Sequence, residues 1–159
     1  MATKRKGVNG KQKGASFERK MVKEFTEWTS WKFQRTLLSG GGEEKADICC
    51  VDRRTPWLIE LKNRESFKEW QLIQYKPTSP VWQWWSKLKT EQKHMGGKPI
   101  MLICKRNGIT PLVTVECGLA QEFLKWEGLT FHATLAIPGE VVHTFLWDEV
   151  RKHVEMTLR

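Results

Sequence analysis

The apolar residues of the chain recur at two spacings, one typical of helices and one typical of strands. Residues 15–29 carry apolar side chains at intervals of four, four and three, which predicts a helix with one apolar stripe: Phe17, Met21, Phe25 and Trp28. Short apolar runs between turn-forming or charged residues instead predict strands, at 31–38, 46–51 and 57–61. The first part of the chain should therefore fold as a helix followed by three strands.

The second half of the chain continues this alternation of helices and strands. A helix is expected to begin at Pro80, because proline is favoured at the first helical position, and to end at the Gly-Gly pair that follows Met95. Strands over 99–105 and 110–115 should form a hairpin around an Asn-Gly turn signal. Beyond the hairpin we expect a short helix, a strand and an amphipathic stretch, at 119–126, 129–136 and 147–158.

Three tryptophans lie in the first turns of the helix that begins at Pro80: Trp82, Trp84 and Trp85. Bases of a single-stranded nucleic acid could stack on such side chains. At helical spacing, large apolar side chains more often belong to the core or to a dimer interface. We favour the core or interface interpretation for most of this group.

A cluster of charged side chains is expected where the strands 46–51 and 57–61 pair as a hairpin. Strand side chains alternate between faces, so Glu60 and Lys62 should project to one side, with Asp47 across the ladder from them. Two carboxylates offer hard oxygen ligands to Mg²⁺. Lys62 beside such an ion could position or deprotonate an attacking water, or stabilise charge that develops on a phosphate.

The charge of the chain points to a polyanionic partner. The 159 residues, about one domain, contain 27 Lys and Arg against 18 Asp and Glu, a formal net charge of +9. Residues 1–13 read as a flexible basic arm, which is either a solvated tail or, as we favour, an arm that wraps the phosphate backbone through Lys4, Arg5, Lys6, Lys11 and Lys13. Without a bilayer-length apolar run or a signal peptide, the protein is expected to be intracellular, in the cytoplasm of its source or of a host.

Cysteine and glycine patterns exclude some other classes of site. Four cysteines, two of them adjacent at 49 and 50, fit neither a C-x-x-C metal site nor a disulfide scaffold, so we expect reduced and mostly buried thiols. The glycine run at 40–42 lacks the spacing of a nucleotide-binding P-loop. Neither a thiol-held metal nor nucleotide hydrolysis is therefore expected.

Asp47 followed by Glu60-Leu61-Lys62 resembles the signature of the PD-(D/E)XK nucleases. Upstream residues narrow the resemblance to Holliday-junction resolvases of the archaeal and phage Hjc type, through a Gly14-x-x-x-Glu18-Arg19 pattern, Arg35 and the Ser39-Gly40 turn. The resemblance covers roughly residues 14–105. It departs from the family at Ala46, where many members have proline, and this change leaves the expected metal ligands intact.

The resemblance implies an α/β fold with a restriction-endonuclease-like core, a central mixed β-sheet flanked by helices, in a single nuclease domain over 14–159. It implies Mg²⁺, with Mn²⁺ as a substitute, held by Asp47, Glu60 and the Leu61 carbonyl and completed by Glu18. Ser39 becomes a candidate for catalysis or phosphate binding, and the two arginines, Arg19 and Arg35, become phosphate contacts. The implied activity is the resolution of four-way DNA junctions by paired symmetric nicks, made by a homodimer.

Two other classes of function stay open at this point. The same fold serves endonucleases that cut duplex, flap or other branched DNA. A noncatalytic DNA-binding protein could also carry the basic arm, with an acidic cluster that is only structural. Dependence on Mg²⁺ separates these classes, because backbone binding alone needs no metal and only weakens with salt.

Overall fold

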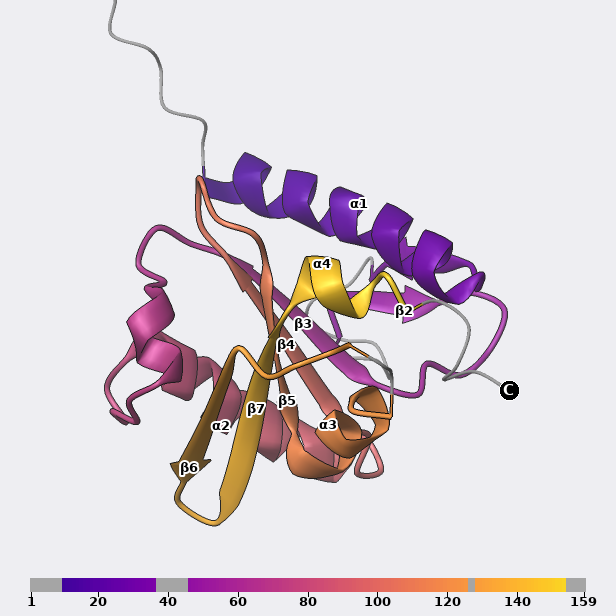
Figure 1. The fold of residues 1–159 in the computed structure, drawn as a ribbon. Coiled ribbons are helices and arrows are strands. Elements are labelled where there is room, and N and C mark those ends of the chain that lie inside the picture. Colours follow the sequence, from indigo (N-terminus) through magenta and orange to yellow (C-terminus); the bar gives the residue numbers. More distant parts are fainter. Residues whose placement is uncertain (1–9, 37–45, 126–127, 154–159) are drawn as a thin grey trace, which may run out of the picture.

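The computed structural model describes residues 10–36, 46–125 and 128–153 (Figure 1). Helices and strands alternate along most of the chain, as the periodicities predict. In chain order the elements are α1 (Gly10–Thr29), β1 (Phe33–Arg35), β2 (Ile48–Cys50), β3 (Leu58–Asn63), the 3₁₀ helix η1 (Glu69–Leu72), α2 (Pro80–His94), β4 (Ile100–Lys105), β5 (Leu112–Glu116), α3 (Cys117–Phe123), β6 (Ala133–Ile137), β7 (Glu140–Leu146) and α4 (Trp147–Val150).

A mixed five-stranded sheet forms the centre of the fold, in the order β3-β4-β5-β7-β6. β3 and β4 run parallel, in register from Leu58 opposite Ile100 to Asn63 opposite Lys105, and the other neighbours are antiparallel. A parallel pair requires a crossover connection, and the chain supplies it through η1 and α2. The expected α/β fold with a mixed sheet flanked by helices, consistent with a restriction-endonuclease-like core, is confirmed.

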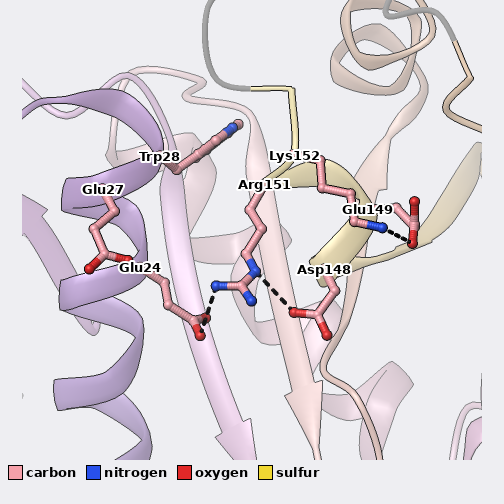
Figure 2. A pocket seen from close by; sticks show the side chains of 7 residues that line it. All are labelled: Glu24, Glu27, Trp28, Asp148, Glu149, Arg151 and Lys152. Carbon is pink, nitrogen blue, oxygen red and sulfur yellow. Dashed lines mark hydrogen bonds and ion pairs between the residues drawn. The ribbon is translucent and has the colours of Figure 1, made fainter.

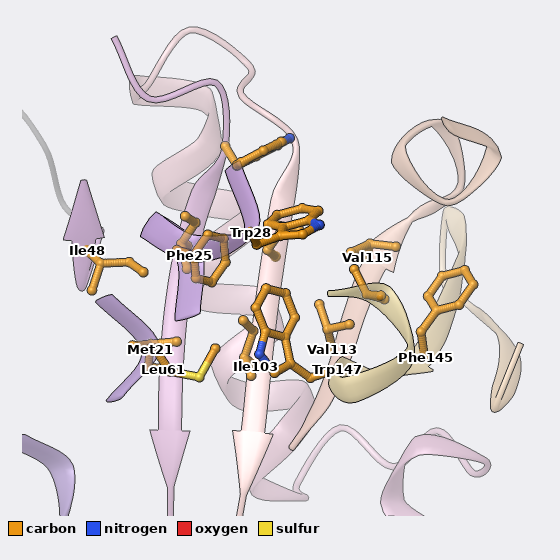
Figure 3. Packing of buried hydrophobic residues seen from close by; sticks show 14 of the residues in the cluster. Met21, Phe25, Trp28, Ile48, Leu61, Ile103, Val113, Val115, Phe145 and Trp147 are labelled. Carbon is orange, nitrogen blue, oxygen red and sulfur yellow. The ribbon is translucent and has the colours of Figure 1, made fainter. Parts of the chain in front are cut away.

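Helices cover both faces of this sheet (Figure 1). The aromatic stripe of α1 packs against one face together with α3 and α4, where Phe25 stacks on Trp147 with ring centroids 4.7 Å apart. Figure 3 shows Trp147 below Trp28 and beside the sheet strands that carry Leu61 and Ile103. The opposite face is covered by α2 through Trp82, Trp85 and neighbouring apolar residues, which confirms the core interpretation for those two tryptophans.

The pairing of the second strand differs from the expected hairpin. β2 pairs antiparallel with β1, with Ile48 opposite Arg35, whereas β3 takes β4 as its partner. The Cys50 amide donates to the Thr55 hydroxyl at 2.8 Å, and this bond shapes the link between β2 and β3. Periodicity identifies strands without identifying their neighbours, and here β3 is buried on both faces and takes a parallel partner.

Two further boundaries differ from the expectations. α1 begins at Gly10, inside the segment 1–13 that was expected to be a flexible arm, because the Lys-Gln-Lys run at 11–13 consists of good helix formers that extend the helix toward the N-terminus. β7 was not predicted at all, although the Pro-Gly turn before it, with Gly139 at a φ of 86°, marks a hairpin. None of the helices in the described part of the chain has the length and hydropathy that a bilayer crossing requires.

Candidate active site

Asp47 lies directly before β2 and is fixed to the edge strand β3 by two hydrogen bonds. Its backbone amide donates to the Ile59 carbonyl at 2.9 Å. Its side-chain Oδ2 accepts from the Leu61 amide at 2.7 Å. Although β2 and β3 belong to different sheets, the carboxylate of Asp47 therefore lies beside the middle of β3, as expected.

Glu60 and Lys62 lie two residues apart on β3 and so share one face of the strand. Lys62 Nζ forms an ion pair with Glu60 Oε1. Glu60 is buried and Lys62 half-buried, and their register partners on β4 are Leu102 and Cys104. The structure thus brings together the predicted trio of Asp47, Glu60 and Lys62.

Electrostatics at this trio leave negative charge uncompensated. Burial, and next the nearby Glu60 carboxylate, raise the pKa of Asp47 from 3.8 to about 7. The Leu61 amide and the Lys62 ammonium act in the opposite direction, and a weaker contribution from Glu18 raises the pKa of Asp47 further. Two buried carboxylates repel each other when both are ionised, and a bound cation would offset this repulsion.

The donor set fits a magnesium ion better than a softer metal. Asp47 and Glu60 supply carboxylate oxygens, and Mg²⁺ prefers one or two carboxylates while it keeps several waters. Within residues 10–36, 46–125 and 128–153, no group of three His, Cys, Asp or Glu side chains could by itself hold a metal ion. The ligand roles of Asp47, Glu60 and the Leu61 carbonyl stay a prediction that this donor set accommodates.

Glu18 projects from α1 toward β1, where its Oε2 accepts a hydrogen bond from Arg35 Nε at 2.6 Å. The Glu18 side chain is about 25% exposed, and its charge reaches Asp47. Because Glu18 already holds an arginine, its role in completing a metal site stays a prediction. Arg19 and Arg35 line one hollow beside α1, of about 350 Å³, together with Val22, Phe33 and Gln34.

The other predicted nucleic-acid contacts are divided between described and undescribed segments. Ser39, Lys4, Arg5 and Lys6 lie outside the described residues. Lys11 and Lys13 belong to the first turn of α1. Lys13 Nζ lies 3.7 Å from Oε1 of the exposed Glu65.

Sequence reasoning expected a buried thiol at Cys104 but missed its position next to the charged trio. Its thiol is fully buried opposite Lys62 in the register, and burial raises its pKa well above the ordinary range. The nearby Lys62 ammonium acts on this pKa in the opposite direction but more weakly than burial, so the thiol stays inert. The apolar run at 99–105 predicted a buried strand, but only the parallel pairing of β3 with β4 places Cys104 at the site.

A larger hollow lies between α1 and α4, and both of its cationic side chains pair with carboxylates that line it (Figure 2). Arg151 reaches the carboxylates of Glu24 and Asp148 at 3.5 and 3.0 Å, and Lys152 pairs with Glu149 at 2.8 Å. This hollow, of about 480 Å³, lies at a contact between helices and contains none of the trio Asp47, Glu60 and Lys62.

Comparisons with known proteins agree with the geometry of the trio. A family model described as "Phage putative PDDEXK endonuclease" matches residues 9–126. No curated protein and no solved structure gives a significant match to the chain. The matched residues include α1 and all of β1 to β5, and therefore every described member of the site.

Proposed function

Since the chain belongs to the phage PDDEXK endonuclease family, we propose that it is a metal-dependent endodeoxyribonuclease that resolves four-way DNA junctions by paired nicks. A single observation carries the nuclease part of this proposal: the Asp47 carboxylate is bound to the Leu61 amide between Glu60 and Lys62. The sequence spacing Asp47 to Glu60-Leu61-Lys62 thus becomes one compact charged group.

Each residue of the group has a defined task in phosphodiester hydrolysis. Asp47, Glu60 and the Leu61 carbonyl would hold Mg²⁺, which when bound supplies Lewis-acid polarisation of the phosphate and activation of water. Lys62 positions the nucleophile and stabilises the negative charge of the transition state. Glu18 keeps the guanidinium of Arg35 at the edge of the site through their 2.6 Å contact, where it can neutralise a phosphate.

The choice of a four-way junction as substrate rests on the resemblance to the Hjc-type resolvases. Gly14, Glu18, Arg19 and Arg35 match that pattern, and the +9 net charge suits a substrate with closely spaced phosphates. A four-way junction has near two-fold symmetry and needs two symmetric nicks, so the active form should be a two-fold homodimer. Sedimentation as a monomer at micromolar concentration in the presence of junction DNA would argue against this assembly.

Cleavage of an end-labelled four-way junction, beside linear duplex, flap and single-stranded DNA, tests the proposal. Each substrate is incubated with Mg²⁺, Mn²⁺ or EDTA, and the wild type is compared with Asp47→Asn and Glu60→Gln. Paired nicks in the junction alone, dependent on metal and on both acids, support resolution. Equal cutting of duplex or flap would support an endonuclease and contradict specificity for the four-way junction. Metal-independent binding without cutting would contradict the proposed catalytic activity.

The acidic variants provide a quantitative form of the same test. Loss of one metal ligand should lower the cleavage rate by roughly 10² or more, which corresponds to several kcal/mol of transition-state stabilisation. Both Asp47→Asn and Glu60→Gln should still bind the junction, since they remove negative charge from a DNA-binding face. Cleavage at the wild-type rate by either variant would show that the site is elsewhere.

A further inference from the structure

We propose that a groove between α1 and the ends of β3 and β4 binds the phosphate backbone of the DNA strand next to the cleaved bond. The proposal rests on the nuclease function proposed above and adds a place where its substrate is held. The groove has a volume of about 380 Å³ and is lined by cationic and amide side chains, among them Lys13, Lys20, Asn63, Lys105 and Asn107. We call it the α1–β4 groove.

Three lysines from two parts of the chain supply the positive charge of the α1–β4 groove. Lys13 and Lys20 lie on α1, and Lys105 ends β4. The ammonium of Lys105 lies 6.0 Å from the ring centroid of Phe17, which directs it across the groove toward the helix. A concentration of positive charge in a hollow attracts phosphate and releases counterions from DNA.

The acidic partners of these lysines are weak competitors for a phosphate. Lys13 Nζ is 3.7 Å from Glu65, whose side chain is 58% exposed. Lys20 Nζ is 3.5 Å from Glu24, a carboxylate that also accepts a hydrogen bond from Trp147. The exposed Lys13–Glu65 pair contributes little stability, so a phosphate with several oxygens can replace it. Glu24 is buried and already held by Trp147, so a phosphate competes with it only for the half-exposed ammonium of Lys20.

Neutral donors complete the groove. Asn63 Nδ2 donates to the Lys13 carbonyl at 3.5 Å, a long bond that also ties the end of β3 to α1. The backbone amide of Asn107 donates to Glu65 Oε1 at 3.4 Å, so this donor is also engaged by the exposed acid at the rim. Amides beside lysines are typical contacts to phosphate oxygens, and they position a duplex without reading its bases.

The α1–β4 groove begins one residue beyond the charged trio. Asn63 follows Lys62 on β3, points to the opposite face of the strand, toward α1, and is paired in register with Lys105. Asn63 lies three residues beyond Glu60 on β3, a span of about 10 Å at roughly 3.3 Å per residue. The groove would therefore hold phosphates within a few nucleotides of the cleaved bond.

Binding measurements in EDTA test the α1–β4 groove separately from cleavage. Fluorescence anisotropy with a labelled junction and duplex, at 50 to 200 mM salt, is carried out in the Asp47→Asn background. Lys105→Ala and Lys20→Ala should each reduce the slope of log affinity against log salt by about 1. The loss of affinity should consequently be about fourfold greater at 50 mM than at 200 mM salt.

Two further variants serve as controls. One removes a negative charge at the groove, and the other removes a lysine far from it. Glu65→Gln should strengthen binding, because it removes the negative charge that competes with phosphate for Lys13. Lys125→Ala should leave binding unchanged, because Lys125 follows α3, at the end of β5 far from the β4–β5 turn. The proposal is overturned if Lys105→Ala behaves like Lys125→Ala, or if Glu65→Gln fails to raise the affinity.

The two proposals can fail separately. If the wild type cuts DNA with Mg²⁺ while the groove variants bind normally, the groove is rejected and the nuclease stands. If no substrate is cut while Lys105→Ala weakens binding and flattens the salt dependence, the groove stands as a DNA contact and catalysis is rejected. Thermal melting of each variant establishes that a change in affinity does not arise from unfolding.

Discussion

The Leu61 amide donates a 2.7 Å hydrogen bond to Asp47 Oδ2 and thereby joins an acid from the small β1–β2 sheet to the edge strand of the large sheet. This bond stabilises the ionised form of Asp47, whereas burial and Glu60 oppose ionisation more strongly. Ionised Asp47 is therefore less stable in the folded protein than in water, and this difference lowers the free energy of unfolding. Such a cost is typical of residues that are retained for chemistry.

Asp47→Asn is expected to stabilise the metal-free protein at pH 8 by about 1–3 kcal/mol, since one pKa unit corresponds to about 1.4 kcal/mol. The pKa of Asp47 is raised to about 7 in the folded state, so between pH 4 and 7 the native state binds the extra proton. The wild type therefore loses stability as pH rises through this window, and the variant does not. Urea unfolding in EDTA at pH 5 and 8 measures the difference, and equal pH profiles for both proteins would contradict it.

Lys62→Met is expected to lower the single-turnover cleavage rate by roughly 10² or more, because it removes the positive charge next to both acids. Without the Lys62 ammonium, the pKa of Asp47 should rise further, which moves the pH of half-maximal cleavage upward. Lys62→Arg, which retains the charge, is the matched control and should keep part of the activity. An unchanged pH profile in Lys62→Met would show that the charge of Lys62 does not affect the pKa of Asp47.

Glu18→Gln should have a smaller effect on cleavage than Asp47→Asn, about tenfold, or about 1.4 kcal/mol in activation free energy. Glu18 holds Arg35 at 2.6 Å and is the weakest of the contributors to the pKa of Asp47. Arg35→Lys should weaken junction binding and cleavage together, since lysine lacks the guanidinium fork. A larger loss for Glu18→Gln than for Asp47→Asn would make Glu18 a direct ligand of the metal.

Trp147→Phe should reduce the free energy of unfolding by about 1–3 kcal/mol, because it removes the buried donor of Glu24. Trp147 Nε1 lies 2.7 Å from Glu24 Oε2, and a phenyl ring would preserve the stacking on Phe25. Equilibrium denaturation measures the loss. Phe145→Leu is the control, because it changes the same core without leaving a hydrogen-bond acceptor unpaired. An unchanged free energy of unfolding in Trp147→Phe would contradict the role of this hydrogen bond.

Thr114 and Thr144 face each other across β5 and β7 and share a buried hydrogen bond of 2.9 Å. Thr114→Val should cost about 1–3 kcal/mol, because the Thr144 hydroxyl is left buried without this partner. The double variant with Thr144→Val should cost less than the sum of the single changes. A double-mutant cycle by urea unfolding tests this, and additive costs would show that the two hydroxyls are not coupled.

The sequence predicted which residues would meet at the site more reliably than it predicted how they would meet. The spacing of Asp47, Glu60 and Lys62 was sufficient, because alternation on a strand depends only on local geometry. The partner of each strand depends on packing between distant segments. The expected hairpin of β2 with β3 was therefore wrong, although Asp47 still lies beside β3.

The α1–β4 groove could not be predicted for the same reason. Lys20 and Lys105 are 85 positions apart, and each by itself looks like an ordinary surface lysine. α2, in contrast, begins at Pro80 as predicted and ends one residue before Met95, because its proline and its Gly-Gly pair are local signals. The unpredicted hydrogen bond from Trp147 to Glu24 likewise joins segments that no periodicity connects.

The contact between Glu24 and Trp147, 123 positions apart, also governs the order in which a newly made chain can fold. A ribosome adds roughly 5–20 residues per second, so α1 emerges on the order of 6–25 s before its last aromatic partner. During that interval Phe25 has no Trp147 ring to cover it. The nascent protein therefore passes through a stage in which its first helix presents an aromatic face to chaperones, and translation speed sets the length of that stage.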